Sequence, residues 1–333
     1  MNRPALIPGL PRVWRGPGEL QIGSDPARAL LLRLPDERCE RVLDLLDGSR
    51  SERLVLIRAA ELGIAEQDCL ALLETLRTAG LILPASSLVP PMLTAGSRQR
   101  LAGEAAALAL HGAPSPAQSL RRRFAARVVV AGRGRLAAPI AVALAEAGVG
   151  GVWPDVTGVV SPAELPGGPL RGADVGRPRR KAIIEIVSRA APGKTHGVRP
   201  SAPSLRIQLD HDAPVSVLAR SLTIKQQPHL AVTIREGSAV IGPLVGARGR
   251  PCLHCLDLHR RERDATWPGS VSAGVEPCAV STVLAATAYA VAEALTFLDG
   301  GTPETTGATA EIRAPGRVRR RSWPPHPECA CAR

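Results

Sequence analysis

Apolar residues in the first 84 positions fall into short runs separated by turn residues. Leu20–Gly23 and Ala29–Leu34 lie on either side of a Ser-Asp-Pro turn and predict two short strands. Leu81–Leu83 predicts a closing strand after the residue Gly80, which ends the preceding helical pattern. Three helices are expected between these strands: from Pro35 to just before Gly48, from a capping box at Ser49 and Glu52 to about Gly63, and from about Ala65 to Ala79. This order predicts a small winged-helix unit.

The pattern changes from Arg127 onward, where buried strands alternate with helices. Arg127–Ala131 is a short apolar run typical of a buried strand, and a helix is expected over Ala138–Ala147. A long Ala-rich helix is expected over Val280–Leu298. This alternation predicts an α/β fold with a Rossmann-like, mostly parallel sheet. We therefore expect three segments: a recognition domain at 1–84, a linker with a short helix at 85–123, and an α/β domain at 124–333.

Charge and composition narrow the class of partner. The formal net charge is +12, which favours acidic partners such as phosphates or acidic peptides. Aromatic residues make up only 2% of the chain, too few for a base-stacking platform, and the basic residues are scattered. The exceptions are two triplets, Arg121–Arg123 and Arg319–Arg321, of the kind that usually form solvated faces. A nucleic-acid partner is therefore not expected.

The N-terminal residues carry no signal-peptide pattern, and no unbroken run of about 18 apolar residues predicts a membrane span. We expect a cytoplasmic protein that does not contact a membrane. In that reducing compartment the seven cysteines are expected to be metal ligands or free thiols rather than a disulfide framework.

Four of the cysteines form two tight pairs in Pro-rich loops. Cys252 and Cys255 have C-x-x-C spacing, and Cys329 and Cys331 have C-x-C spacing. Two short thiolate pairs are the usual way to build a tetrahedral zinc site, and a closed site of four thiolates is structural. Because the second pair is one residue shorter than C-x-x-C, His254 or His326 remains an alternative ligand. Free thiols or a disulfide are the other interpretation.

The strand at Arg127–Ala131 leads into the turn Gly132-Arg133-Gly134-Arg135-Leu136-Ala137 and then into a helix. Backbone amides and a helix N-terminus at such a G-x-G-x-x-A turn are suited to bind phosphate. We take Gly132 and Gly134 as candidate nucleotide-binding residues. The pattern alone is weak, and a Rossmann-like fold without a nucleotide has the same turn.

Several segments of residues 127–331, taken together, resemble the ThiF family of adenylating enzymes, which is related to ubiquitin-activating enzymes. They are LAEAGVGGV at Leu144–Val152, the D-x-G-x-P segment at Asp174–Pro178, and HLAVTIREGSAVIGPLVGARGRPCLHCL, which resembles the hairpin before the family's first zinc knuckle. The resemblance implies a ThiF-type fold clamped by zinc, a site for ATP and magnesium, and a homodimer. By position it assigns Arg179 and Asp212 to the nucleotide site, with Asp212 as the candidate catalytic residue. Asp155 lies one place from the family's acidic position, where it could still reach a ribose hydroxyl, and is kept as a candidate nucleotide-binding residue.

This chain departs from the ThiF pattern at most of the positions that handle ATP. The replacements are Val156 and Gly158 for two acidic residues, Glu164 for Asn, Gly167 for the phosphate-binding Arg, Arg179 for Lys, Leu209 for the first Asp of a pair, and Arg135 for a Gly. Forming an acyl-adenylate requires metal and cationic groups that neutralise the triphosphate. We therefore expect a degenerate adenylation site.

The first block resembles the PqqD-like elements that recognise leader peptides. The resemblance lies in RVLDLLDGSRSERLVLIRAAELG followed by LLETLRTAGLI. It implies that a leader peptide adds a strand to the small sheet, held by main-chain hydrogen bonds. A packing module and a DNA-binding winged helix are the alternatives.

After the first cysteine pair, Cys255–Arg260, Asp264 and Trp267-Pro268 resemble a C-L-D-L-H-R…D…W-P signature of actinobacterial leader-peptide-binding, cyclodehydratase-associated proteins. This implies a scaffold for ribosomal peptide (azoline or bacteriocin) biosynthesis, which binds the precursor's leader and serves a YcaO-type cyclodehydratase partner. The alternative is an ATP-dependent adenylyltransferase that activates the C-terminus of a ubiquitin-like or sulfur-carrier protein. His259 is expected to have a capping or partner-contact role rather than that of a general base, and Cys278 a structural one.

Overall fold

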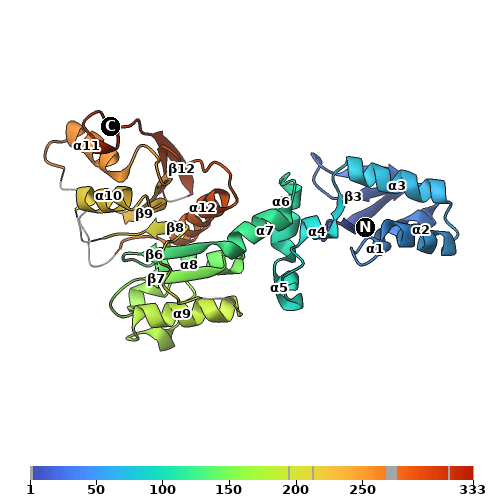
Figure 1. Ribbon diagram of the computed structural model, residues 1–333, viewed down its shortest axis with the longest axis horizontal. Coiled ribbons are helices and arrows are strands. Elements are labelled where there is room, and N and C mark those ends of the chain that lie inside the picture. The colour runs from blue at the N-terminus through green and yellow to red at the C-terminus, as the bar shows by residue number, and fades with distance from the viewer. Residues whose placement is uncertain (1–2, 194–195, 212–213, 268–275, 314–315, 333) are drawn as a thin grey trace. The chain divides into compact units, whose positions relative to one another are not determined.

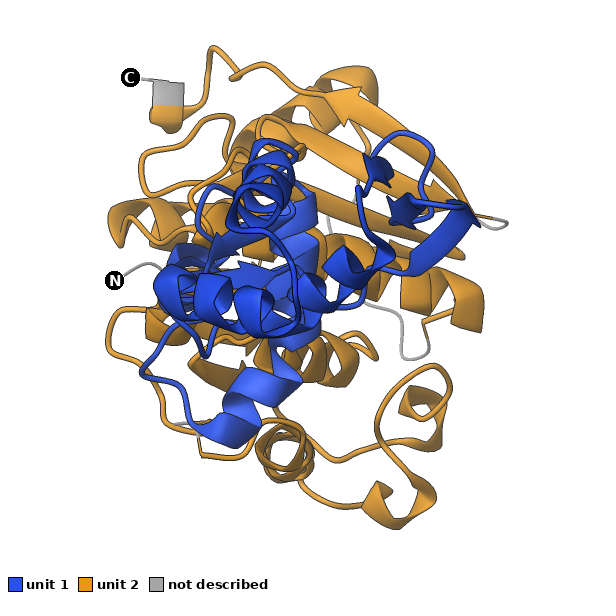
Figure 2. Cartoon of the chain, turned by 90° about the vertical axis from the view of Figure 1, so that its right-hand side faces the viewer, with its two compact units in different colours: residues 1–121 blue, residues 122–333 orange. Residues whose placement is uncertain are grey.

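The computed structural model describes residues 3–193, 196–211, 214–267, 276–313 and 316–332 (Figure 1). The chain divides into two compact units, residues 1–121 and 122–333 (Figure 2). Each unit has its own apolar core.

Unit 1 contains two small antiparallel sheets. The three-stranded sheet has the order β2 (Arg12–Gly16), β3 (Glu19–Ile22) and β4 (Leu30–Arg33). Strand β1 (Pro4–Leu6) pairs with β5 (Ile82–Pro84). Strands β3, β4 and β5 were expected. The sequence pattern missed β1, which has three residues, and β2, whose residues are all partly or fully exposed and carry no apolar alternation.

Three helices share an apolar core with the three-stranded sheet. They are α1 (Glu40–Leu45), preceded by a 3-10 turn at Glu37–Cys39, α2 (Glu52–Glu61) and α3 (Glu66–Thr78). The predicted capping box at Ser49 is wrong, because Ser51 is the N-cap of α2 and its hydroxyl accepts from the Leu54 amide at 3.3 Å. Ser49 instead binds Asp47, through its amide at 2.8 Å and its hydroxyl at 2.5 Å.

Residues 85–123, expected to be a linker with one short helix, contain three helices and most of a fourth, and those up to Arg121 belong to unit 1. These are α4 (Ala85–Leu88), α5 (Ala95–Arg100), α6 (Ala102–Leu110) and the beginning of α7 (Pro116–Ala125). Their buried residues form a small cluster of their own with Ala5: Leu88, Leu93, Leu101, Ala105 and Leu120. The Pro-rich segment is therefore packed structure.

Unit 2 is built on a seven-stranded sheet of order β12-β11-β10-β9-β8-β6-β7. The parallel half consists of β7 (Gly151–Asp155), β6 (Arg127–Ala131), β8 (Leu205–Gln208) and β9 (His229–Arg235). The antiparallel half continues from β9 through β10 (Ser238–Val245), β11 (Ala308–Arg313) and β12 (Arg317–Ser322). The predicted strand at 127–131 and the predicted hairpin, β9 and β10, are confirmed.

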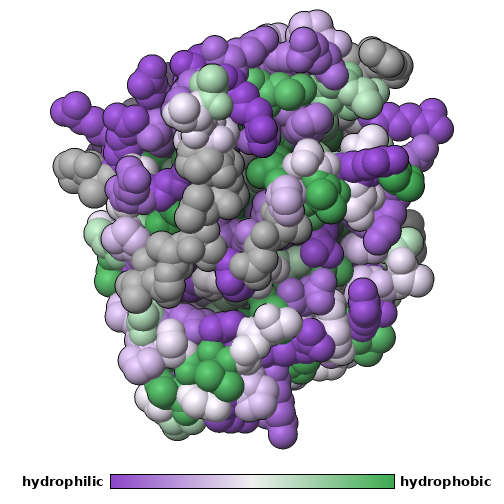
Figure 3. Space-filling view, turned by 90° about the vertical axis from the view of Figure 1, so that its left-hand side faces the viewer, coloured by the Kyte–Doolittle hydropathy of each residue, from purple (hydrophilic) through white to green (hydrophobic). Residues whose placement is uncertain are grey.

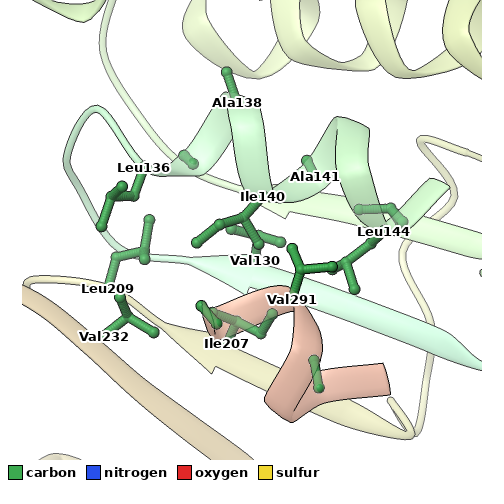
Figure 4. Close-up of a cluster of buried hydrophobic side chains, with 14 of the residues drawn as sticks. Val130, Leu136, Ala138, Ile140, Ala141, Leu144, Ile207, Leu209, Val232 and Val291 are labelled. Carbon is green, nitrogen blue, oxygen red and sulfur yellow. The ribbon is translucent and has the colours of Figure 1, made fainter. Parts of the chain in front are cut away.

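Helices cover both faces of this sheet. One face carries α8 (Ala137–Glu146), α9 (Arg179–Ala190) and α12 (Val280–Leu298), which share the large apolar core with the strands. Figure 4 shows Ile140 and Leu144 of α8 close to Val130 of β6, with Val291 of α12 in the same cluster. On the other face, α10 (Val215–Ile224) and α11 (Leu253–Arg263) pack around Ala219, Leu222 and Leu253.

Helix α12 is 19 residues long, with a mean hydropathy of 1.5 in its most apolar window, so by length and composition it is able to cross a membrane. The expectation of no such segment counted only unbroken apolar runs. In unit 2, α12 packs against β10 and α8. Its buried Glu293 accepts a hydrogen bond from the Thr305 amide at 2.7 Å. This packing is typical of a core helix.

The face of the molecule shown in Figure 3 is mostly hydrophilic. On that face, hydrophilic side chains cover most of the described residues, and apolar side chains lie in several separate groups. Edge strand β12 is exposed along its whole length and carries Arg317, Arg319, Arg320 and Arg321. Charged edge strands of this kind disfavour pairing with another sheet.

Candidate functional site

Two sites in unit 2 carry the residues that the sequence singled out, and the first is the cysteine cluster. Cys252 Sγ lies 3.9 Å from Cys255 Sγ and 3.5 Å from Cys329 Sγ, while Cys255 Sγ lies 3.3 Å from Cys331 Sγ. All four sulfur atoms lie within 4.8 Å of one another. Tetrahedral zinc with Zn–S bonds of about 2.3 Å places sulfurs roughly 3.8 Å apart. The four residues therefore fit a zinc ion.

Local structure explains how these thiols meet. Cys252 is the N-cap of α11 and Cys255 lies in its first turn, where the positive end of the helix favours thiolates. Cys329 and Cys331 come from the tail beyond β12, and the buried Trp323 packs in the same cluster. Burial raises the pKa of Cys252. A metal ion that binds thiolates would offset that cost, because it favours the deprotonated form.

The neighbouring histidines hold the tail in place. His259 Nε2 lies 3.0 Å from the Pro324 carbonyl, and His326, which is buried, places Nε2 2.8 Å from Glu262. His254 Nδ1 lies 3.7 Å from Cys329 Sγ, outside the group of four sulfurs. The contacts of His259 tie α11 to the tail.

The C-L-D-L-H-R…D…W-P segment has a structural explanation in the same region. Asp257 is 2% exposed and accepts hydrogen bonds from Trp267 Nε1 at 3.2 Å and Arg261 Nε at 3.0 Å. The Trp267 ring is flanked by the guanidinium groups of Arg235 and Arg260, at 5.7 and 5.5 Å from its centroid. The hydrogen bond between Asp257 and Trp267 thus fixes the end of α11.

The second site lies where β6 enters α8. Gly132 and Gly134 both adopt left-handed φ angles, +107° and +115°, that other residues rarely adopt. The Arg133 amide donates to the Asp210 carbonyl at 2.8 Å, which fixes the loop against the end of β8. The two glycines therefore have the expected place, at the carboxyl end of a parallel strand and before a helix.

A carboxylate already lies against this loop. The Arg135 amide donates to Glu276 Oε2 at 2.9 Å. A Cβ atom added to Gly134 would lie 2.3 Å from Glu276 Oε1, so the carboxylate occupies the space directly over the glycine. Glu276 precedes α12 and is separated from Arg135 by 141 positions in sequence.

Glu276 lies beside a second half-buried acid, Asp210. Burial, followed by the negative charge of Glu276, raises the pKa of Asp210 to about 6. Burial also raises the pKa of Glu276, although the Arg135 amide opposes that shift. The positive charges of Arg235 and Arg133 act on Asp210 in the opposite direction. The loop thus faces two carboxyl groups whose negative charges repel each other.

Arg135 holds the segment of Glu276 against the loop a second time. Its Nη1 donates to the Cys278 carbonyl at 3.0 Å and its Nη2 to the Pro166 carbonyl at 2.8 Å. The guanidinium group is therefore directed at two carbonyls of this chain. Burial raises the pKa of the Cys278 thiol, which disfavours the nucleophilic thiolate.

Arg179, a predicted nucleotide ligand, is paired within the chain. Its Nε and Nη2 donate to the two carboxylate oxygens of Glu164 at 2.8 and 2.9 Å. It also donates to the Thr157 and Val159 carbonyls. The side chains of Arg179 and Glu164 are 16% and 9% exposed. Two departures from the ThiF pattern therefore form one buried ion pair.

Asp155 lies at the end of β7, as expected, but two guanidinium groups face it. Its carboxylate oxygens are 3.5 Å from Arg206 Nη1 and 3.9 Å from Arg180 Nη2. A cavity of about 630 Å³ lies beyond this strand end, lined by residues that include Val156, Gly158, Arg180 and Lys181. Asp212 lies outside the described residues.

Sequence reasoning missed the contributions of Glu276, Asp210 and Arg235 to the loop site. No spacing rule brings these residues together, because each comes from a different segment of the chain.

No protein-family model and no curated protein matches the sequence. The fold is similar to that of E. coli MccB crystallised with ATP, with a TM-score of 0.67 and 14% identity over 98% of this chain and 99% of that chain. MccB in complex with N-formylated MccA, described as the microcin C7 biosynthetic enzyme, has a TM-score of 0.67 at 14% identity, over 99% of each chain. PaaA has a TM-score of 0.65 at 14% identity, over 94% of this chain and 98% of that chain. The chain therefore shares the MccB-like α/β fold along its length.

Proposed function

We propose that this chain is a peptide-binding scaffold of ribosomal peptide modification, with a ThiF-type domain that adenylates poorly or not at all. The ion pair between Glu164 and Arg179 carries this proposal. At the two positions where the ThiF pattern has Asn and Lys for the nucleotide, this chain has an acid and a base that satisfy each other.

The charge at the loop site points in the same direction. Adenylation needs cations around the triphosphate, and transition-state stabilisation by such groups is usually the largest catalytic contribution. Here Arg179 is neutralised by Glu164, and Arg135 is directed at two carbonyls. Two carboxyl groups, Asp210 and Glu276, face the loop. These groups disfavour a bound polyphosphate.

Peptide binding is supported by unit 1 and by the structural neighbours. Strands β2 and β4 are the edges of the three-stranded sheet, and Leu31 of β4 is 48% exposed. An edge strand is the kind of element to which an extended peptide adds through main-chain hydrogen bonds. The neighbours of similar fold include MccB crystallised with MccA. We propose that unit 1 is a PqqD-like, winged-helix recognition domain that binds a precursor leader.

In this proposal zinc would be held by Cys252, Cys255, Cys329 and Cys331, where it would supply a structural crosslink between α11 and the tail. With four thiolates the ion has no open position for substrate. The chain would act in the cytoplasm as a homodimer and present the peptide to a YcaO-type cyclodehydratase, the partner that spends the ATP.

One alternative function has specific support. The glycine loop keeps its shape, and MccB of similar fold was crystallised with ATP and with AMPCPP and MccA. Under this alternative the chain adenylates the C-terminus of a peptide, a ubiquitin-like protein or a sulfur carrier. The cavity beyond β7 would then receive part of the nucleotide.

A direct test measures peptide binding by the full-length protein. Fluorescein-labelled synthetic peptides, taken from the short reading frames that flank the gene, are titrated with protein and followed by anisotropy. Saturable binding that a scrambled peptide lacks supports the scaffold. Binding to none of these peptides contradicts it.

A variant of Leu31, the exposed leucine of β4, tests where the peptide binds. L31D places a charge on edge strand β4 and should weaken leader binding about tenfold, the equivalent of about 1.4 kcal/mol. V217D is the matched control, because Val217 is a comparably exposed apolar residue of unit 2. Equal affinity for L31D and V217D would rule out β4 as the docking edge.

A further inference from the structure

The carboxylate of Glu276 lies where a phosphate would lie in a nucleotide-binding loop. The Arg135 amide, which donates to Glu276, follows the second glycine of the G-x-G-x-x-A turn. Gly134 leaves open the space that the carboxylate fills, with Oε1 2.3 Å from the position of an added Cβ. Helix α8 begins two residues after Arg135, so its positive end also favours an anion.

We propose that Glu276 is a built-in competitor of nucleotide phosphate, which occupies the anion position of the glycine loop and must leave before a nucleotide can bind. This contact is autoinhibitory. The proposal deepens the proposed function, because it names a residue that weakens the nucleotide site. It rests on the proposed function only for the statement that the competing ligand is a nucleotide.

The bonds around Glu276 are arranged to keep it in place. Arg135 holds the segment at two points, through its amide to Glu276 and through its guanidinium group to the Cys278 carbonyl. The side chain of Asp210 also shares a hydrogen bond with Glu276. A side chain that merely lay near the loop would not need three attachments from two other segments.

A carboxylate and a phosphate oxygen compete directly here, because both are anionic acceptors for the same amide and are favoured by the same helix N-terminus. A nucleotide can displace Glu276 in two ways. Either the contact between Arg135 and the Cys278 carbonyl breaks, or that contact stays and only the Glu276 side chain turns away from the loop. Removing the carboxylate should therefore strengthen nucleotide binding, whereas removing a true ligand would weaken it.

The experiment titrates full-length, zinc-loaded protein with ATP by calorimetry, once with Mg²⁺ and once with EDTA. E276Q keeps the shape of the side chain and removes its charge, and E276A also empties the space. E146Q is the matched control, because Glu146 is an exposed glutamate on α8 that makes the same change in net charge. Leader-peptide binding is measured on the same samples.

The expected result is that E276A and E276Q bind ATP on the order of tenfold more tightly than the wild type, in both buffers, while E146Q is unchanged. Hydrogen exchange gives a second readout. The Arg135 amide should be protected in the ligand-free wild type, exposed in E276A, and protected again in E276A with ATP.

Three results would overturn the proposal. Equal ATP affinity in wild type and E276A would mean that Glu276 does not compete. Weaker binding in E276Q with Mg²⁺ but not with EDTA would make Glu276 a ligand of the nucleotide's cation. No ATP binding by any variant would mean that the loop is not a phosphate position. Peptide binding on the same samples would judge the scaffold separately in each case.

Discussion

The cysteine cluster and the glycine loop of unit 2 both match sequence patterns, but the structure treats them differently. At the cysteine cluster, two segments more than 70 residues apart bring four sulfurs within 4.8 Å, with buried packing around them. At the loop, the backbone has the expected shape, but internal acids and carbonyls satisfy the groups that a nucleotide would need.

We propose that the difference reflects a fold that was kept while its adenylation chemistry was lost. Four sulfurs collected in one place fit a metal ion, and burial raises the pKa of Cys252, which leaves its free thiol a poor nucleophile. A glycine loop, in contrast, is also a means of joining a strand to a helix. Its phosphate-binding ability can disappear through a few substitutions that leave the backbone unchanged.

The largest effect is expected at the cysteines. C252S or C255S should abolish zinc binding and destabilise unit 2 by several kcal/mol, because structural zinc sites contribute folding free energy directly. Zinc content by mass spectrometry and thermal unfolding measure the two effects.

C278S is the matched control, because Cys278 lies outside the group of four sulfurs. It should keep one zinc per chain and its melting temperature. Full stability of C252S without zinc would make the cluster a set of free thiols and remove the contrast with the loop.

The next effect concerns the ion pair between Glu164 and Arg179. E164Q leaves the Arg179 guanidinium buried without its counter-charge and should destabilise the protein by about 3 kcal/mol in urea unfolding. E185Q removes an exposed partner of Arg177 and should leave the unfolding midpoint unchanged. If E164Q also unfolded like the wild type, the pair would be free to open for a nucleotide.

The smallest effect is a pH dependence at the loop. Because the pKa of Asp210 is raised to about 6 from 3.8, the protonated carboxyl favours the folded state. That contribution is complete below about pH 4 and is lost as the pH rises through about 6. D210N keeps a neutral group at every pH, so it should be more stable than the wild type by about 2 kcal/mol at pH 8 and equally stable at pH 4. A gain at pH 4 as large as at pH 8 would contradict this cause.

The sequence predicted features that depend on local order. The paired cysteines, the glycine turn between β6 and α8, the hairpin β9–β10 and the helix Val280–Leu298 all follow from spacing or periodicity within one segment. These are the features that hydrophobic period and turn residues determine.

The contents of the loop site could not be predicted in this way. Glu276 and Arg135 are separated by 141 positions, and Glu164 and Arg179 by 15, with no period linking either pair. Considered alone, Glu164 looked like the loss of a nucleotide ligand, whereas Arg179 looked like a ligand that was kept. The structure shows that Glu164 and Arg179 compensate each other, and that Arg135 is used to hold the segment of Glu276.

ATP–pyrophosphate exchange is the most direct test of the central claim that the fold keeps its clamp but not its adenylation chemistry. Full-length, zinc-loaded protein is incubated with ATP, Mg²⁺ and labelled pyrophosphate, with and without the bound precursor peptide or a candidate carrier protein. We predict exchange no faster than in a protein-free control. Exchange above that background that disappears in D212A would contradict the claim and make the chain an adenylyltransferase.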